Sequence, residues 1–66
     1  MDINKLKGKL VEKQMNVETL AKTIGVERSS MYRKFNNAEK ITIGEALKIK
    51  LALGLSDAEA SEIFLG

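Results

Sequence analysis

The sequence predicts an all-α fold, a single compact domain of five helices that covers residues 1–66. Two observations favour it. The chain contains no proline, the residue that most strongly interrupts a helix. Its apolar residues recur three or four positions apart, which is helical spacing, and they do not alternate as in a strand. With 66 residues, the chain is long enough for one small hydrophobic core and no more.

The first two helices are indicated by apolar spacing and by the residues at their ends. Asn16 can accept a hydrogen bond from a backbone N–H of the second helix, and Met15 has the spacing to pack against Leu20. Gly25 can take the left-handed backbone conformation that ends a helix. We therefore expect helices over roughly residues 2–14 and 17–24.

The third helix is expected over residues 28–36, because Met31 and Phe35 lie four positions apart and indicate a buried side. Val26, in the preceding turn, can pack back into the core. Two short helices joined by a three- to four-residue turn containing glycine form a helix-turn-helix, here over about residues 17–36. The second helix of such a unit enters the major groove of DNA.

The fourth and fifth helices each begin with a capping box, Thr-x-x-Glu at residues 42–45 and Ser-x-x-Glu at 56–59. Gly54 can end the fourth helix. The spacing predicts helices over about residues 43–53 and 57–65. Their expected core positions are Ile43, Ala46, Ile49 and Leu53 in the fourth, and Ala60, Ile63 and Phe64 in the fifth.

Composition excludes several classes of protein. With no cysteine and no histidine, the chain can form neither a disulfide nor an ordinary zinc site, and we expect no metal or other cofactor. Catalysis is disfavoured, because 66 residues without these side chains leave little room for a pocket holding an acid–base pair. No apolar run approaches the ~18 residues of a membrane span, and we see no signal peptide. A cytoplasmic location is the default expectation.

Charge is distributed unevenly along the chain. The first 40 residues carry nine basic and five acidic side chains, whereas the remaining 26 carry two basic and four acidic ones. This layout favours a basic N-terminal surface that faces an anionic partner, with an acidic end turned away.

The chain also resembles a known family in the order and spacing of its segments. The matching segments are Leu6 to Ile24, the turn Gly25-Val26, Arg28-Ser29-Ser30, residues 33–37 and the stretch from Ile43 to Ser56. They resemble the lambda-repressor/Cro-like (Xre-type) helix-turn-helix regulators, and most closely the short phage-type members. The resemblance spans about residues 3–65 and implies binding of double-stranded DNA.

Four residues of the third helix are candidates for contacts with DNA bases. If Met31 and Phe35 point inward, the outward side carries Arg28, Ser29, Tyr32 and Arg33. Arginine can pair with guanine O6 and N7, serine can bond to most base edges, and tyrosine can contact a thymine methyl or a phosphate. The resemblance implies base readout at Arg28, Ser29 and Arg33. Glu27 could accept from cytosine N4 or orient Arg28.

Contacts with the DNA backbone are expected on either side of this helix. At the start of the second helix, the N–H groups of Asn16 and Val17 can meet a phosphate. At and after the end of the third helix, the resemblance implies sugar-phosphate contacts. The residues there are Lys34, Asn36, Asn37 and Lys40.

An exposed apolar patch is expected on the fourth helix and the C-terminal end. It would combine Leu47 and Leu51 with Ile63, Phe64 and Leu65, although a five-helix core could also bury them. An exposed patch of this kind in a small domain indicates a partner surface, here a possible homodimer interface.

Two functions therefore compete. The first is a sequence-specific transcriptional regulator that binds a palindromic operator as a homodimer, with its recognition helices ~34 Å apart. It could serve as a repressor, a Cro-like switch or a recombination accessory factor, associated with the nucleoid when bound. The alternative is a small helical protein-interaction module, antitoxin-like or an adaptor, that uses the apolar patch. No membrane partner and no small-molecule ligand is indicated.

Overall fold

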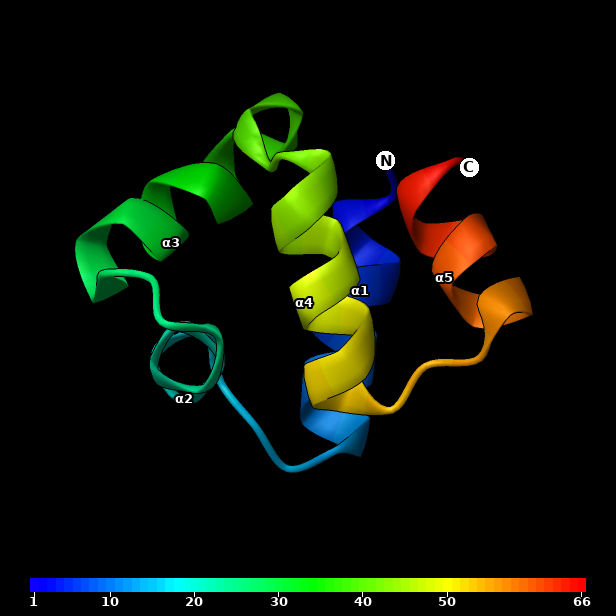
Figure 1. Cartoon of the computed structure of the whole chain (residues 1–66), viewed down its shortest axis with the longest axis horizontal. Coiled ribbons are helices and arrows are strands. Elements are labelled where there is room, and N and C mark those ends of the chain that lie inside the picture. The colour runs from blue at the N-terminus through cyan, green and yellow to red at the C-terminus, as the bar shows by residue number, and fades with distance from the viewer.

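The computed structural model describes all 66 residues and consists of helices, with no strand (Figure 1). The predicted all-α fold with five α-helices is therefore confirmed. The α-helices are α1 (Ile3–Glu12), α2 (Val17–Ile24), α3 (Arg28–Asn36), α4 (Ile43–Leu53) and α5 (Asp57–Phe64), and a short 3-10 helix, η1, covers Ala38–Lys40. None of the helices combines the length and the apolar character needed to cross a bilayer.

The core draws on all five α-helices. In the view of Figure 1, α4 runs through the middle, between α2 and α3 on one side and α5 on the other, with α1 behind it. Each α-helix contributes a large side chain that is at most 1% exposed, and burying such a side chain stabilises the fold by about 1.5–3 kcal/mol. These side chains are Leu6, Leu20, Met31, Ile49 and Ile63.

The predicted cap residues occupy their expected positions. Asn16 Oδ1 accepts from the backbone N–H of Thr19 at 2.8 Å, so α2 begins where its cap predicts. Both capping boxes, which begin at Thr42 and Ser56, are formed in both directions. Gly25 ends α2 with a positive φ of 75°. Local residue chemistry therefore explains four helix ends, namely both ends of α2 and the starts of α4 and α5.

The first helix is shorter than expected and ends at Glu12. Gln14 has a φ of +57°, and Met15 N–H donates to the carbonyl oxygen of Leu10 at 2.8 Å. This is the hydrogen-bond pattern of a left-handed helix end, and the same pattern follows α2 at Gly25. Because the left-handed residue here is a glutamine, the sequence lacks the glycine that would have indicated the end.

The prediction that Ile43 faces the core is wrong. Its side chain is 85% exposed, whereas Ile49 and Leu53 on the same helix are buried. Each residue turns about 100° around a helix axis, so Ile43 points roughly 100° away from the direction midway between Ile49 and Leu53. Ile43 therefore shares the outer side of the helix with Leu47 and Leu51, which are also exposed.

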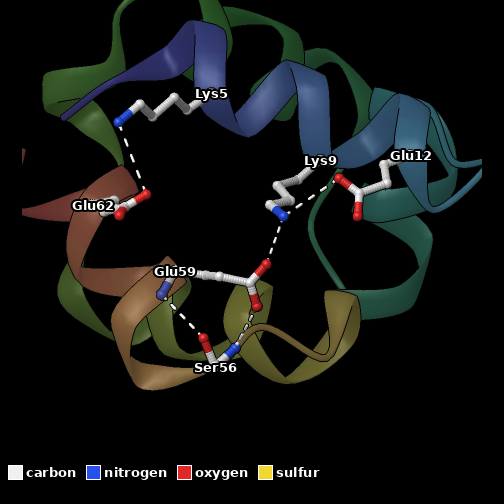
Figure 2. A network of polar contacts seen from close by, with 6 residues as sticks. All are labelled: Lys5, Lys9, Glu12, Ser56, Glu59 and Glu62. Atoms are coloured by element: carbon white, nitrogen blue, oxygen red, sulfur yellow. Dashed lines mark hydrogen bonds and ion pairs between the residues drawn. The ribbon is translucent and has the colours of Figure 1, made fainter.

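Ion pairs join α1 to α5 on the surface of the molecule (Figure 2). Lys9 Nζ contacts Glu12 Oε2 at 3.3 Å and donates a short hydrogen bond to Glu59 Oε2. The other oxygen of Glu59 accepts from the backbone N–H of Ser56 at 2.9 Å, as part of the capping box. The hydrogen bond from Lys9, supported by those from Ser56, lowers the pKa of Glu59 from 4.5 to about 2.

Glu59→Gln is expected to weaken the fall in stability on the acid side. Because folding lowers the pKa of Glu59, its contribution to stability is present above pH 4.5 and is lost as the pH falls towards 2. Without the carboxylate, the Tm should be lower at neutral pH and should change less between these two pH values. Thermal unfolding followed by circular dichroism measures both effects.

Glu62→Gln is the control for this variant, since Glu62 makes only one 3.9 Å contact with Lys5 (Figure 2). It should keep the pH dependence of the wild type. If Glu59→Gln also kept it, the Lys9–Glu59 contact would not stabilise the fold.

Candidate nucleic-acid interface

α2 and α3 form a helix-turn-helix around a short turn. Ala21 is buried and small, so α3 can approach α2 closely. The N–H of Val26 donates to the carbonyl oxygen of Ala21 at 2.9 Å, and its side chain packs against the core. In Figure 1, α2 is seen almost end-on with α3 lying across it. The turn thus holds α3 at the periphery, with one side free.

The outer side of α3 carries all four predicted base-contact residues. Met31 and Phe35 are buried and fix the rotation of the helix against the core. Arg28, Ser29 and Arg33 are exposed, and Tyr32 is 47% exposed. We call these four residues the recognition stripe. All four side chains are therefore accessible to solvent. Arg28 lies three positions before Met31, on the same side of the helix, and is exposed as the first residue of α3.

The polar contacts of the recognition stripe differ from the prediction that Glu27 orients Arg28. Its carboxylate accepts from the hydroxyl of Ser29 at 2.7 Å and does not contact Arg28. Arg28 instead pairs with Glu18 of α2, with 3.3 Å between its terminal nitrogen and Glu18 Oε1. The suggestion that Glu27 orients Arg28 is therefore wrong. Glu27 also makes no cap bond, which leaves the first turn of α3 without a side-chain cap.

The start of α2 offers backbone groups beside the recognition stripe. Asn16 is exposed, and its Oδ1 accepts both the backbone N–H and the hydroxyl of Thr19. The Val17 side chain packs against the core, so only its backbone N–H is available to a ligand. Because the amino end of a helix carries partial positive charge, this end of α2 is suited to an anion.

The predicted backbone-contact residues at and after the end of α3 divide into two groups. Lys34 is half-buried and forms a short ion pair with Glu45. Glu45 also accepts from the backbone N–H of Thr42 at 2.9 Å. The hydrogen bond from Lys34, and after it the one from Thr42, lower the pKa of Glu45 below its usual range. Lys34 thereby ties α3 to the start of α4. In contrast, three residues are exposed to solvent: Asn36, Asn37 and Lys40.

A family model for the Cro/C1-type helix-turn-helix DNA-binding domain matches residues 5–62. The chain belongs to the Cro/C1-type helix-turn-helix family. The resemblance to lambda-repressor/Cro-like regulators is thus confirmed, and the domain is a DNA-binding one of the kind found in transcription regulators. Comparisons with curated proteins and with solved structures gave no match.

In this Cro/C1-type domain, the apolar surface differs in part from the predicted patch. Ile63 is 1% exposed and belongs to the core, so its assignment to an interface is wrong. At this position α5 also meets the start of α1, where the N–H of Asp2 donates to the carbonyl oxygen of Ile63 at 2.7 Å. Leu65 is exposed and Phe64 is half-buried. Both line a hollow of about 340 Å³ between α4 and α5, together with Leu47.

The exposed apolar residues of α4 form a continuous row. Ile43, Leu47 and Leu51 are four residues apart and 85, 57 and 80% exposed. We call this row the α4 ridge. Leu47 lines the hollow beside α5, whereas Leu51 lies next to a second hollow beside α2. The predicted patch is therefore a ridge along α4, with Ile43 as the member that the sequence assigned to the core.

Proposed function

We propose that this domain is a sequence-specific transcription regulator that places α3 in the major groove of double-stranded DNA. The observation that carries the proposal is the recognition stripe: four polar or aromatic side chains exposed on a helix whose opposite side is buried. The family supports DNA binding of this kind, and an α-helix fits the width of the major groove.

Each member of the recognition stripe has a chemical role in this proposal. Arg28 and Arg33 pair with guanine O6 and N7, and Tyr32 contacts a thymine methyl or a phosphate. Because the hydroxyl hydrogen of Ser29 is directed to Glu27, Ser29 presents acceptor lone pairs to the DNA. Its partner is then an amino group, on cytosine N4 or adenine N6.

Backbone contacts set the position of α3 in the groove. The N–H groups of Asn16 and Val17 meet one phosphate at the amino end of α2. The contacts at and beyond the end of α3 come from Asn36, Asn37 and Lys40, which are exposed. Lys34 joins them only if it leaves Glu45, so we assign it the smallest share of the binding.

Two copies of the chain act together on a palindromic operator. A single domain of this size offers few contacts, and a second bound copy raises affinity without new chemistry. The α4 ridge supports this proposal, because exposed apolar rows of this kind serve as partner surfaces. Bound over a promoter, such a dimer excludes polymerase, which is the action of a phage-type repressor in the cytoplasm.

Arg33→Ala is expected to cost about 1–3 kcal/mol of binding free energy on the preferred DNA site and to relax the preference at one base pair. The site is first selected from a random DNA pool with the wild type. Fluorescence anisotropy then gives the affinity of each variant for that site and for its single-base-pair substitutions.

Lys7→Ala is the matched control, because Lys7 is an exposed cation on α1 that makes no ion pair. It should leave the base preference intact. An equal loss on every sequence with Arg33→Ala would show that Arg33 contacts a phosphate and reads no base.

A protein-interaction module, antitoxin-like or an adaptor, is the second candidate, and the α4 ridge with the adjoining 340 Å³ hollow favours it. The same DNA selection separates the two functions. An interaction module would bind random DNA weakly and would be insensitive to the loss of Arg28 and Arg33.

A further inference from the structure

One ion pair crosses the helix-turn-helix on its exposed side. The guanidinium of Arg28, in the first turn of α3, lies 3.3 Å from Glu18 Oε1, in the first turn of α2. The two residues are ten positions apart, and both side chains are more than half exposed. This ion pair links a residue of the recognition stripe to α2.

Stability does not explain why Glu18 contacts Arg28. Exposed ion pairs of this kind contribute little to folding, because solvent screens the charges and two long side chains must be held in place. An acidic residue in the first turn of α2 is favourable for the helix dipole, but that effect needs no contact with Arg28. A carboxylate close to DNA phosphates also opposes binding.

Guanidinium geometry indicates what the contact can do. The group is planar and carries five N–H donors in a fixed arrangement. Glu18 engages one terminal nitrogen, so the donors of the other nitrogens stay free for a base edge. A flexible arginine loses rotamer freedom when it binds, and a contact that is already formed in the free protein reduces that loss. It also favours one orientation of the donors over others.

We infer that Glu18 is a specificity-determining positioning residue, which holds the Arg28 guanidinium in the orientation that reads one base pair. This inference rests on the proposed function, in which the first turn of α3 enters the major groove. Glu18 itself contacts no base, and it acts through Arg28. Its negative charge lowers the affinity for all DNA, while its contact with Arg28 increases discrimination between sequences.

The test compares Glu18→Ala with Glu18→Gln on DNA. Glutamine removes the charge but keeps an acceptor oxygen at the same reach, whereas alanine removes both. Glu62→Gln on α5 is the control for the loss of one negative charge away from the recognition stripe. The site is selected with the wild type, Arg28→Ala identifies the base pair that Arg28 reads, and competition binding gives the preference there.

Glu18→Ala should lower the preference at that base pair about threefold or more, which is a typical size for coupling between residues in contact. Glu18→Gln should keep most of the preference, and in an Arg28→Ala background neither change should have an effect on it. Glu62→Gln should leave it unchanged. Circular dichroism melting curves confirm that each variant is folded.

Two results would overturn the inference. If Glu18→Ala and Glu18→Gln both raise affinity equally for every sequence and leave the preference unchanged, Glu18 only repels phosphates and the proposed function stands. If the wild type selects no preferred sequence from the random pool, the proposed function fails, and this inference fails with it.

Discussion

Raising the salt concentration from 50 to 200 mM is expected to weaken binding to a two-half-site duplex by about 10³–10⁵-fold. A dimer that neutralises ~6–10 phosphates releases a similar number of condensed cations, and this release becomes less favourable as salt rises. Each copy contributes one phosphate contact at the start of α2 and contacts from Asn36, Asn37 and Lys40, so two copies give a number of this order. Anisotropy titrations at several salt concentrations give the slope of log affinity against log salt.

Lys40 provides the internal check on this slope. It is exposed in η1 and makes no ion pair, so Lys40→Ala should reduce the slope by about one for each bound copy. It should weaken binding equally on all sequences. Lys7→Ala on α1 should leave the slope unchanged. A wild-type slope near zero would contradict phosphate contact altogether, and an unchanged slope with Lys40→Ala would remove Lys40 from the interface.

Leu47→Asp is expected to lower affinity for a duplex with two half-sites by about 10²–10⁴-fold and to leave affinity for one half-site unchanged. Leu47 is the central member of the α4 ridge and, like Ile43, lines the hollow beside α5. A buried carboxylate without a partner is strongly unfavourable in an apolar interface. Because the side chain is already exposed in the single copy, aspartate there leaves the fold intact.

Val11→Asp is the matched control, since Val11 is an exposed apolar residue on α1, away from the α4 ridge. Analytical ultracentrifugation gives the oligomeric state of both variants, and anisotropy gives their affinities for one and two half-sites. If Leu47→Asp bound both duplexes as Val11→Asp does, the α4 ridge would not be the dimer interface.

Features that depend on neighbouring residues in the chain could be predicted. Asn16, Thr42 and Ser56 cap helices within their own segments, and Gly25 ends α2 through its own backbone conformation. The exposure of Ser29 and Arg33 follows from the helical period once Met31 and Phe35 are buried, whereas Arg28, three positions before Met31, is exposed as the first residue of α3. Such features are local, so spacing along the chain is sufficient to find them.

Features that depend on packing between elements could not be predicted in the same way. Glu18 and Arg28 are ten residues apart, and Lys34 and Glu45 are eleven apart, with no local pattern that joins them. Ile43 is three positions before Ala46, as a core residue could be, yet packing buries the side of α4 that carries Ile49 and Leu53, and Ile43 lies away from that side. The left-handed end of α1 at Gln14 carries no glycine.

Methylation protection on the selected duplex tests most directly whether the recognition stripe enters the major groove. Dimethyl sulfate modifies guanine N7 in the major groove and adenine N3 in the minor groove. We expect protection of guanine N7 in each half-site and none of adenine N3, and Arg33→Ala should restore reactivity at one guanine. Protection of adenine N3 alone, or unprotected guanines at saturating protein, would contradict the placement of α3.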